Sequence, residues 1–246
     1  MIPRYSRKIM TDIWSDNNRY RCWLNVELAA VEAMAEAGLV PAEAVATIKA
    51  KADFDAKRVE EIEAVTRHDV IAFLTNVAEY VGEPSRFIHM GMTSSDVLDT
   101  AYNMQLIEAG SILLADIDKM LAVLKRRAYE HKDTVQMGRS HGIHAEPITF
   151  GLKLAIWYDE MQRNKRRLLA ALEDVRVGKI SGAVGTFAHL PPQIEENALA
   201  ALGLAPAPAS SQIVQRDRHA AFFTALAVLG GTRSEERRVG KECRSR

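Results

Sequence analysis

The sequence has few of the features that would place it outside the ordinary globular proteins. Two cysteines in 246 residues cannot form a disulfide framework, so the reducing cytoplasm is the simplest expected compartment. Equal numbers of basic and acidic residues, 32 of each, argue against a dedicated nucleic-acid binder, which needs a basic face for the phosphates. No apolar run approaches the roughly 20 residues of a membrane span, and the opening residues 1–6 lack the apolar core of a secretory signal.

The sequence does have enough apolar residues to build a sizeable core. Hydrophobic residues make up 48% of the chain and charged residues 26%, values that are ordinary for a folded protein. This composition excludes a disordered chain, a collagen-like fibre and a small disulfide-stapled protein. Because the length exceeds the usual ~100–150 residues of one domain, we expect one large domain or two smaller ones.

The last stretch, residues 233–246, differs from everything before it. It holds six basic and three acidic residues and follows the apolar stretch Phe222–Leu229 abruptly. The string resembles the translation of a common sequencing-library adapter, so we expect Thr232 to be the last residue of the protein's own sequence. A solvated basic tail is the alternative interpretation.

Helical periodicity dominates the first part of the sequence. Apolar residues between Asp16 and Ala37 recur every three or four positions, and Gly38 follows as a stop signal. Asp55 and Asp69 are each placed to cap a further helix. No segment in this part alternates as a strand would, so we expect residues 1–92 to form a small N-terminal helical domain.

Longer helices are expected after residue 92. Ser94 or Ser95 can cap a helix that reaches about Tyr129, and Pro147 suits the first turn of another that runs to about Val175. The apolar residues of this second helix alternate four and three residues apart, as in a coiled coil; they are Phe150, Leu154, Trp157, Met161, Asn164, Leu168, Ala171 and Val175. Such helices pack in bundles, so residues 93–232 are expected to form an incomplete helical-bundle domain.

Two details of this region have alternative interpretations. Asn164 either favours one register of the bundle from within the seam or faces water at the helix edge. The glycine-rich stretch Gly178–Leu190 has the composition of a loop and could hold a short hairpin.

Polar residues gather where helices are expected to begin. Arg67, His68 and Asp69 precede one helix, and the stretch from His89 to Asp96, with three hydroxyl residues, precedes another. A helix start offers free N–H groups and the positive end of the helix dipole, which suits an anionic ligand. Capping alone is the simpler explanation of Asp69 and of one of the hydroxyls.

A third polar group lies between residues 138 and 147. It contains His141, His144 and Glu146, but no further cysteine or histidine at ligand spacing, so we expect no metal there. A histidine between small residues suits a general acid or base near neutral pH. A structural hydrogen bond would equally explain any one of these histidines. Gln212, which follows a Pro/Ala/Ser linker at residues 205–211, could contact a polar ligand.

Taken together, these motifs resemble the fumarase/aspartase superfamily and, within it, the adenylosuccinate lyase family of the bacterial type. The segments that carry the resemblance are Arg4-Tyr5-Ser6, Arg67-His68-Asp69, Thr93–Asp96 with Asp99-Thr100, and Gly138–Gly142 followed by Ala145-Glu146-Pro147. They occur in the family's order between residue 1 and about residue 232.

The resemblance implies an all-α fold and a lyase that cleaves a C–N bond by β-elimination. The family releases fumarate from adenylosuccinate, which leaves AMP, and from the succinylcarboxamide ribotide of purine biosynthesis. No cofactor and no metal is implied. The complete protein is expected to be a homotetramer whose active sites are shared between subunits.

The resemblance also implies roles for particular residues. His141 would be the general acid, and His68 would bind or orient the substrate near its phosphate. Substrate-binding roles fall to Arg4 and Tyr5 on the nucleotide, Arg67 and Asp69 in the same pocket, Thr93 and Ser94 on the succinyl carboxylates with His89 close by, and Gln212 on the succinyl part.

One family motif is missing from the sequence. The family's catalytic base is a serine on a mobile Ser-Ser-x-Met-Pro-x-Lys-x-Asn loop, and these 246 residues contain no such segment. We therefore expect the chain by itself to turn over substrate poorly.

Two other interpretations stay open. One is another superfamily member, such as a carboxymuconate cycloisomerase-like protein, against which Arg67-His68-Asp69 and Arg4-Tyr5 argue. The other is a non-catalytic helical scaffold that dimerises through the seam of residues 150–175.

Overall fold

The computed structural model describes residues 2–241, and the side chains of residue 2 and residues 4–232. Helices dominate these residues, and the strands they contain form two small two-stranded sheets. The predicted all-α fold class is confirmed. None of the helices in this part of the chain is long and apolar enough to cross a membrane.

The chain folds into two compact units, each assembled from two stretches of sequence. Unit 1 comprises Met1–Ala109 and Val175–Arg216, and unit 2 comprises Gly110–Asp174 and Asp217–Arg246. The longest helix, α6 (Ser94–Glu130), contributes its first part to unit 1 and the rest to unit 2. These units group the chain by contacts, and the domain boundaries expected at residues 92 and 232 stay predictions.

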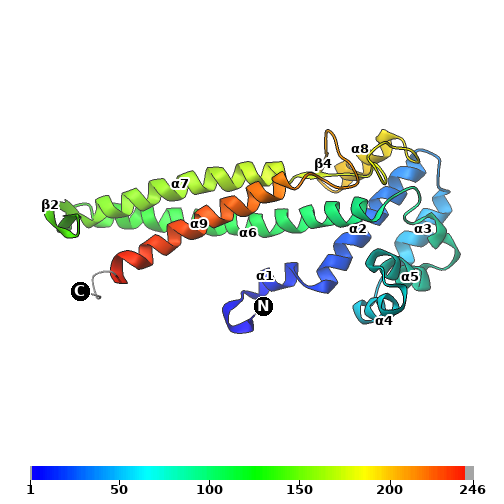
Figure 1. Cartoon of the computed structure of the whole chain (residues 1–246), viewed down its shortest axis with the longest axis horizontal. Helices are drawn as coiled ribbons and strands as arrows, with labels where there is room; N and C mark the ends of the chain where they lie inside the picture. Colours follow the sequence, from blue (N-terminus) through cyan, green and yellow to red (C-terminus); the bar gives the residue numbers. More distant parts are fainter. Residues whose placement is uncertain (1, 242–246) are drawn as a thin grey trace. The chain divides into compact units, whose positions relative to one another are not determined.

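Unit 1 is built from short helices around one long helix, α2 (Figure 1). Its elements before α6 are η1 (Pro3–Tyr5), α1 (Lys8–Ile13), α2 (Asp16–Glu36), α3 (Ala42–Lys51), α4 (Ala56–Thr66), α5 (Asp69–Val81) and η2 (Glu83–Phe87). Its later elements are β3 (Val177–Gly178), α8 (Pro192–Ala201) and β4 (Ala205–Pro206).

Aromatic rings fill the centre of unit 1. Tyr20 stacks on Phe73 with ring centroids 5.6 Å apart, and Trp23 meets both rings edge-on. Tyr20, Trp23 and Phe73 are each at most 4% exposed. The apolar periodicity of Asp16–Ala37 therefore identified the buried face of α2, because residues three and four apart share one side of a helix.

Of two predicted helix caps in unit 1, one is confirmed and the other is wrong. Asp55 caps α4 as predicted, with its carboxylate accepting hydrogen bonds from the N–H groups of Lys57 and Arg58. Asp69, expected to cap α5, instead lies in its first turn, and His68 is the capping residue. The reason is local: His68 has extended backbone and its Nδ1 accepts from the N–H of Ile71 at 3.4 Å.

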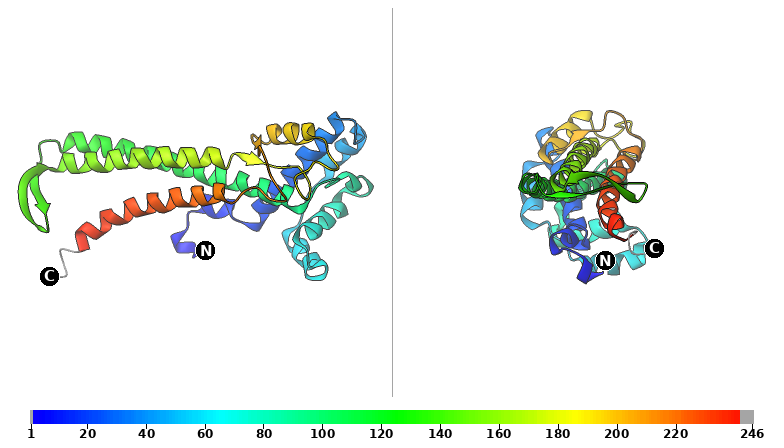
Figure 2. Two further views of the ribbon diagram at one scale, coloured as in Figure 1. Left: turned by 45° about the horizontal axis from the view of Figure 1, so that its top comes forward. Right: turned by 90° about the vertical axis from the view of Figure 1, so that its left-hand side faces the viewer.

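The helices of unit 2 are the second part of α6, α7 (Phe150–Asp174) and α9 (Asp217–Lys241), which lie side by side (Figures 1 and 2), and the unit also includes a β-hairpin. The three helices approach one another closely at Gly110 of α6, since a Cβ there would lie 2.5 Å from Leu172 of α7 and 3.2 Å from Phe222 of α9. The predicted seam of α7 is confirmed, with Leu154, Met161 and Leu168 buried. The stretch expected to be a tail, residues 233–246, continues α9 as far as Lys241.

Asn164 lies inside the seam and does not face water. It is 2% exposed, its side-chain amide donates to Thr232 Oγ1 at 2.8 Å, and its Oδ1 accepts from Arg167. Thr232 in turn donates to Glu160 at 2.7 Å. This polar set joins α7 to α9, and the interpretation of Asn164 as an edge residue is wrong.

A β-hairpin stands where the start of α7 was expected. β1 (Val135–Ser140) pairs antiparallel with β2 (Ile143–Thr149) (Figure 2). Pro147 of β2 lies opposite Met137 of β1. The pairing is irregular between Met137 and Arg139. A proline, which has no N–H to donate, is tolerated at such an irregularity or at an edge. The helix therefore begins at Phe150, and Thr149 caps it by accepting from the N–H of Leu152.

The stretch Gly178–Leu190 forms no hairpin, contrary to the expectation. Its first residue belongs to β3, which pairs in parallel with β4, so that Val177 faces Ala205 and Gly178 faces Pro206. A Cβ on Gly178 would lie 2.4 Å from Leu199. Close packing of the backbone, rather than a turn, explains this glycine.

Candidate active site

The start of α6 is held by a buried carboxylate in its own first turn. Asp96 is fully buried, and its Oδ2 accepts a hydrogen bond from the N–H of Thr93 at 2.9 Å. An acidic side chain that reaches back three residues in this way is one half of a capping box. Thr93 and Ser94 are half-buried at this helix start.

Lys179 pairs with Asp96 inside unit 1. Both side chains are fully buried, and Lys179 Nζ contacts Asp96 Oδ1 and donates to the carbonyl of Gly182 at 3.2 Å. The N–H of Gly182 donates to Asp96 Oδ2. Each charge has lost its hydration, so each depends on the other and on these hydrogen bonds. The pair fixes the segment 179–182 against the first turn of α6.

Further hydrogen bonds hold the same segment in place. The hydroxyl of Thr100 accepts from the N–H of Lys179 at 3.1 Å and lies 3.2 Å from its carbonyl. Asn103 donates to the carbonyl of Val177 at 2.7 Å. Glu195 of α8 accepts from the N–H of Ile180 at 2.6 Å, and burial raises the pKa of Glu195 despite that bond.

His89 lies just before α6 and is bonded to a carboxylate from α2. Its Nδ1 donates to Glu27 Oε1 at 2.6 Å, and the two side chains are 16% and 1% exposed. Burial lowers the pKa of His89, but the hydrogen bond and negative charge of Glu27, with the charge of Asp96, outweigh burial and raise the pKa above its ordinary value. The ring therefore favours the cationic form more than an ordinary histidine does.

Arg67, His68 and Asp69 form the junction between α4 and α5. Arg67 ends α4 in the left-handed conformation, and the side chains of His68 and Asp69 are 47% and 45% exposed with 3.4 Å between Nδ1 and Oδ1. Asp69 also accepts from the N–H of Val70. The three side chains predicted to share a pocket thus emerge together at one exposed helix junction.

The remaining predicted residues of unit 1 are exposed. Arg4 lies over the ring of Tyr5, 4.8 Å from its centroid, and Tyr5 is 74% exposed. Gln212 is exposed on the segment after β4. This segment is tied to residue 181 of the anchored stretch, because the hydroxyls of Ser181 and Ser210 share a hydrogen bond of 2.9 Å.

His141 belongs to unit 2 and lies at the tip of the hairpin. It and Gly142 form the two-residue turn between β1 and β2, with φ of +54° and +77°. Positive φ at both central residues is typical of the hairpin turn that matches strand twist. His141, His144 and Glu146 are exposed, and in the part of the chain described no group of three or more histidine, cysteine or acidic residues could hold a metal ion.

Left-handed backbone marks several of the predicted site residues. Among residues 2–241 the non-glycine residues with positive φ are Arg67, His89, His141 and Phe187. Such a conformation costs about 1–3 kcal/mol and collects at functional sites. The first three are residues that the motifs had already singled out, although nothing in a motif specifies a dihedral angle.

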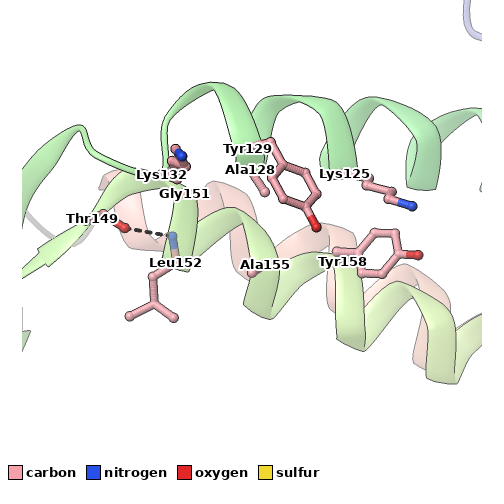
Figure 3. Close-up of a pocket in the computed structure, with 9 residues that line it drawn as sticks. All are labelled: Lys125, Ala128, Tyr129, Lys132, Thr149, Gly151, Leu152, Ala155 and Tyr158. Atoms are coloured by element: carbon pink, nitrogen blue, oxygen red, sulfur yellow. Dashed lines mark hydrogen bonds between the residues drawn. The ribbon is translucent and has the colours of Figure 1, made fainter.

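Unit 2 has one further feature that could bind a ligand, a surface pocket of about 430 Å³ near the first turns of α7 (Figure 3). Figure 3 shows the rings of Tyr129 and Tyr158 along it, with Lys125 and Lys132 at its edge. None of the residues predicted for the site lines this pocket.

Three buried charged residues of the site were not predicted, namely Glu27, Lys179 and Glu195. The sequence held one weak signal, the lysine between Gly178 and Ile180, since a lysine in an otherwise apolar, glycine-flanked stretch must find a partner when buried. Glu27 gave no signal, because an acidic residue on a helix is ordinarily exposed.

Comparison with known proteins assigns the chain to a family. A family model described as Lyase matches residues 4–232. The adenylosuccinate lyase of Aquifex aeolicus (strain VF5) is 54% identical over 235 residues, which are 94% of this chain and 54% of the relative. The adenylosuccinate lyase of Synechocystis sp. (strain ATCC 27184 / PCC 6803 / Kazusa) is 53% identical over 94% of this chain and 54% of its own length.

A solved structure has the same fold. The 3-carboxy-cis,cis-muconate lactonizing enzyme from Pseudomonas putida matches with a TM-score of 0.83 and 32% identity, over 92% of this chain and 54% of that one. The chain belongs to the lyase family, within the fumarase/aspartase superfamily, and the resemblance seen in its motifs is confirmed. The chain spans about half the length of the curated relatives that it matches.

Proposed function

We propose that this chain carries part of the active site of an adenylosuccinate lyase. The reaction cleaves the C–N bond of adenylosuccinate by β-elimination and yields fumarate and AMP, and the succinylcarboxamide ribotide of purine biosynthesis reacts in the same way. Identity of 54% and 53% to adenylosuccinate lyases over nearly the whole chain supports this substrate class.

The chemistry assigns separate tasks to the residues. A base removes the carbon proton next to a carboxylate, hydrogen-bond donors stabilise the dianionic intermediate, and an acid protonates the leaving nitrogen. We assign His141 as the acid and His68 as the second catalytic residue, which orients the substrate near its phosphate. The exposed position of His141 at a two-residue turn supports its role, because the ring is free to meet a substrate.

The binding residues fall into sets with different chemistry. Arg4, Tyr5, Arg67 and Asp69 are assigned to the nucleotide. Thr93, Ser94 and His89 are assigned to the succinyl carboxylates, which suits a cationic ring beside a helix start, and Gln212 to the succinyl part. The observation that carries the proposal most is the 54% identity to an adenylosuccinate lyase over 94% of this chain, and left-handed backbone at Arg67, His89 and His141 accompanies it.

A second candidate substrate class comes from the structural match. A carboxymuconate enzyme shares the fold at 32% identity, so a carboxymuconate substrate is the alternative. The higher identity to adenylosuccinate lyases makes it the less favoured one.

A chimera tests the proposal directly. Residues 1–232 replace the matching half of the Aquifex aeolicus relative, and fumarate release from adenylosuccinate is followed by chromatography, with the parent enzyme as control. We expect the chimera to release fumarate and its His141→Ala variant to lose at least ~100-fold in kcat, as for loss of a general acid. A folded chimera that is inactive on adenylosuccinate but active on a carboxymuconate would refute the proposal.

The assembly is also part of the proposal. We infer that the complete protein is a cytoplasmic homotetramer with active sites shared between subunits, and that it needs no cofactor. Light scattering of the chimera tests this assembly. Mixing two inactive variants, one His68→Ala and one His141→Ala, tests shared sites, because recovery of activity requires residues from different subunits at one site.

A further inference from the structure

Unit 1 contains a buried carboxylate that the proposed reaction does not use. Glu27 lies on α2, whose residues Trp23, Leu24 and Ala30 are buried in the core, and it is 1% exposed. Its Oε1 accepts from His89 at 2.6 Å, whereas its Oε2 is buried without a hydrogen-bond partner in the described part of the chain. A buried carboxylate with one oxygen unsatisfied lowers stability, so its presence calls for an explanation.

His89 is the group through which Glu27 can act. Its backbone is left-handed, with φ of +65°, and its side chain is 16% exposed. Because Nδ1 faces Glu27, Nε2 at the other edge of the ring is the nitrogen left for a ligand. A protonated ring donates from both nitrogens.

A tight turn carries His89 into the start of α6. The N–H of Met92 donates to the carbonyl of His89 at 3.2 Å, and Gly91 in this turn has φ of +74°. A Cβ on Gly91 would lie 2.9 Å from Leu190, so the turn is packed closely against the segment before α8. The backbone that joins His89 to Thr93 is therefore fixed by packing.

Two carboxylates on different elements raise the pKa of His89, and η2, which precedes His89 in the chain, carries a balanced pair of charges. Glu27 lies on α2 and bonds the ring, and Asp96 lies on α6, where Lys179 already pairs with it. On η2, Glu83 and Arg86 form an exposed pair of opposite charge. Within the described residues, Glu27 is thus the buried carboxylate hydrogen-bonded to the ring, and no lysine or arginine ion pair joins it.

We propose that Glu27 is a positioning residue, which fixes the imidazole of His89 and keeps it cationic so that Nε2–H binds an anionic oxygen group of the substrate. The shared chemistry of that group is a carboxylate or phosphate oxygen. The identity of the substrate rests on the proposed function, whereas the action of Glu27 on His89 does not.

The first experiment follows the His89 ring itself in the 246-residue chain. The ring signals are assigned by their loss in His89→Gln and titrated by NMR in the parent, in Glu27→Gln and in Glu36→Gln, an exposed glutamate on the same helix. Removing an opposite charge at hydrogen-bond distance is expected to lower the titration midpoint of the His89 ring by about one pH unit or more. Glu36→Gln is expected to leave that midpoint unchanged. An unchanged midpoint in a folded Glu27→Gln chain overturns the proposal.

The second experiment measures binding. Fumarate and inorganic phosphate are titrated separately into the same three proteins at pH 7.5, which distinguishes a carboxylate from a phosphate site. Glu27→Gln is expected to weaken the binding of one of the two probes about three- to tenfold. The reason is that a change of one pH unit in the titration midpoint alters the cationic fraction of the ring up to tenfold. Affinities equal to the parent for both probes overturn the proposal.

Two further variants keep the test decisive. If Glu27→Gln does not fold, Glu27→Asp retains the charge, and a midpoint that stays close to the parent supports an electrostatic role. In an active chimera, Glu27→Gln is expected to raise KM more than it lowers kcat and to recover at lower pH. A folded chimera that acts on a carboxymuconate and not on adenylosuccinate refutes the proposed function alone, because the ring titration needs no turnover.

Discussion

Replacing Lys179 by methionine would leave the carboxylate of Asp96 buried without its cation. Methionine keeps most of the length and apolar packing of lysine, so the change isolates the charge. Both side chains are fully buried, with no surface exposed to solvent. Removing one partner of such a pair costs about 3–5 kcal/mol. Asp96 keeps the N–H groups of Thr93 and Gly182, so we expect the lower half of that range. At about 2–4 °C per kcal/mol for a protein of this size, the melting temperature would fall by roughly 6–16 °C.

The assay uses tryptophan fluorescence during urea unfolding. Trp157 lies in unit 2, so a Trp157→Phe background leaves Trp14 and Trp23, both in unit 1. The double variant Lys179→Met with Asp96→Asn removes both charges and is expected to be at least ~1 kcal/mol more stable than Lys179→Met alone, since contacting residues are coupled. A loss below about 1 kcal/mol in Lys179→Met, or equal losses in both variants, would refute the argument that a desolvated ion pair holds this segment.

Other predictions follow from the packing and from His89. Leu168→Ala in the seam of α7, where the side chain is 1% exposed, is expected to lower the stability of unit 2 by about 2–5 kcal/mol, whereas Leu169→Ala, at 43% exposed, serves as a near-neutral control in the same urea experiment. Gly151→Ala is expected to destabilise because the new Cβ would lie 2.5 Å from the carbonyl oxygen of Ala128, while nothing lies within 4 Å at Gly230, so Gly230→Ala should stabilise by about 0.5–1 kcal/mol; thermal melts that rank the two variants in the opposite order would contradict this. Because the pKa of His89 is raised on folding, its contribution to stability is complete below the unfolded pKa and is lost as pH rises through the folded one; urea midpoints across this range should show that loss in the parent and little of it in Glu27→Gln.

The sequence was sufficient to locate most helices and the residues that face their cores. The periodicity of Asp16–Ala37 and of residues 150–175 identified buried faces, because a helix repeats its side-chain directions every 3.6 residues whatever it packs against. Asp55 predicted the start of α4 for a similarly local reason, because an N-cap needs only its own side chain and the next few N–H groups. The family motifs at residues 67–69, 93–96 and 138–142 were also visible, each within a few consecutive residues.

Local patterns failed where pairing decided the structure. Pro147 fits a helix start by composition, yet strand pairing with Met137 placed it in β2. The turn at His141-Gly142 was hidden because its first residue is not glycine, although it has positive φ. Asn164 could not be assigned from the sequence either, since its burial depends on Thr232, 68 residues away.

The contacts that build the candidate site were decided by the tertiary structure alone. Lys179 and Asp96 are 83 positions apart in the sequence, and Glu27 and His89 are 62 apart. A lone lysine or glutamate on a helix or loop is ordinarily solvated, so nothing in its neighbours along the chain foretells burial. The sequence by itself determined the helices, the polar motifs at their junctions and the family. Only the fold determined which distant charges lose their water together, because desolvation depends on everything that surrounds a group in space.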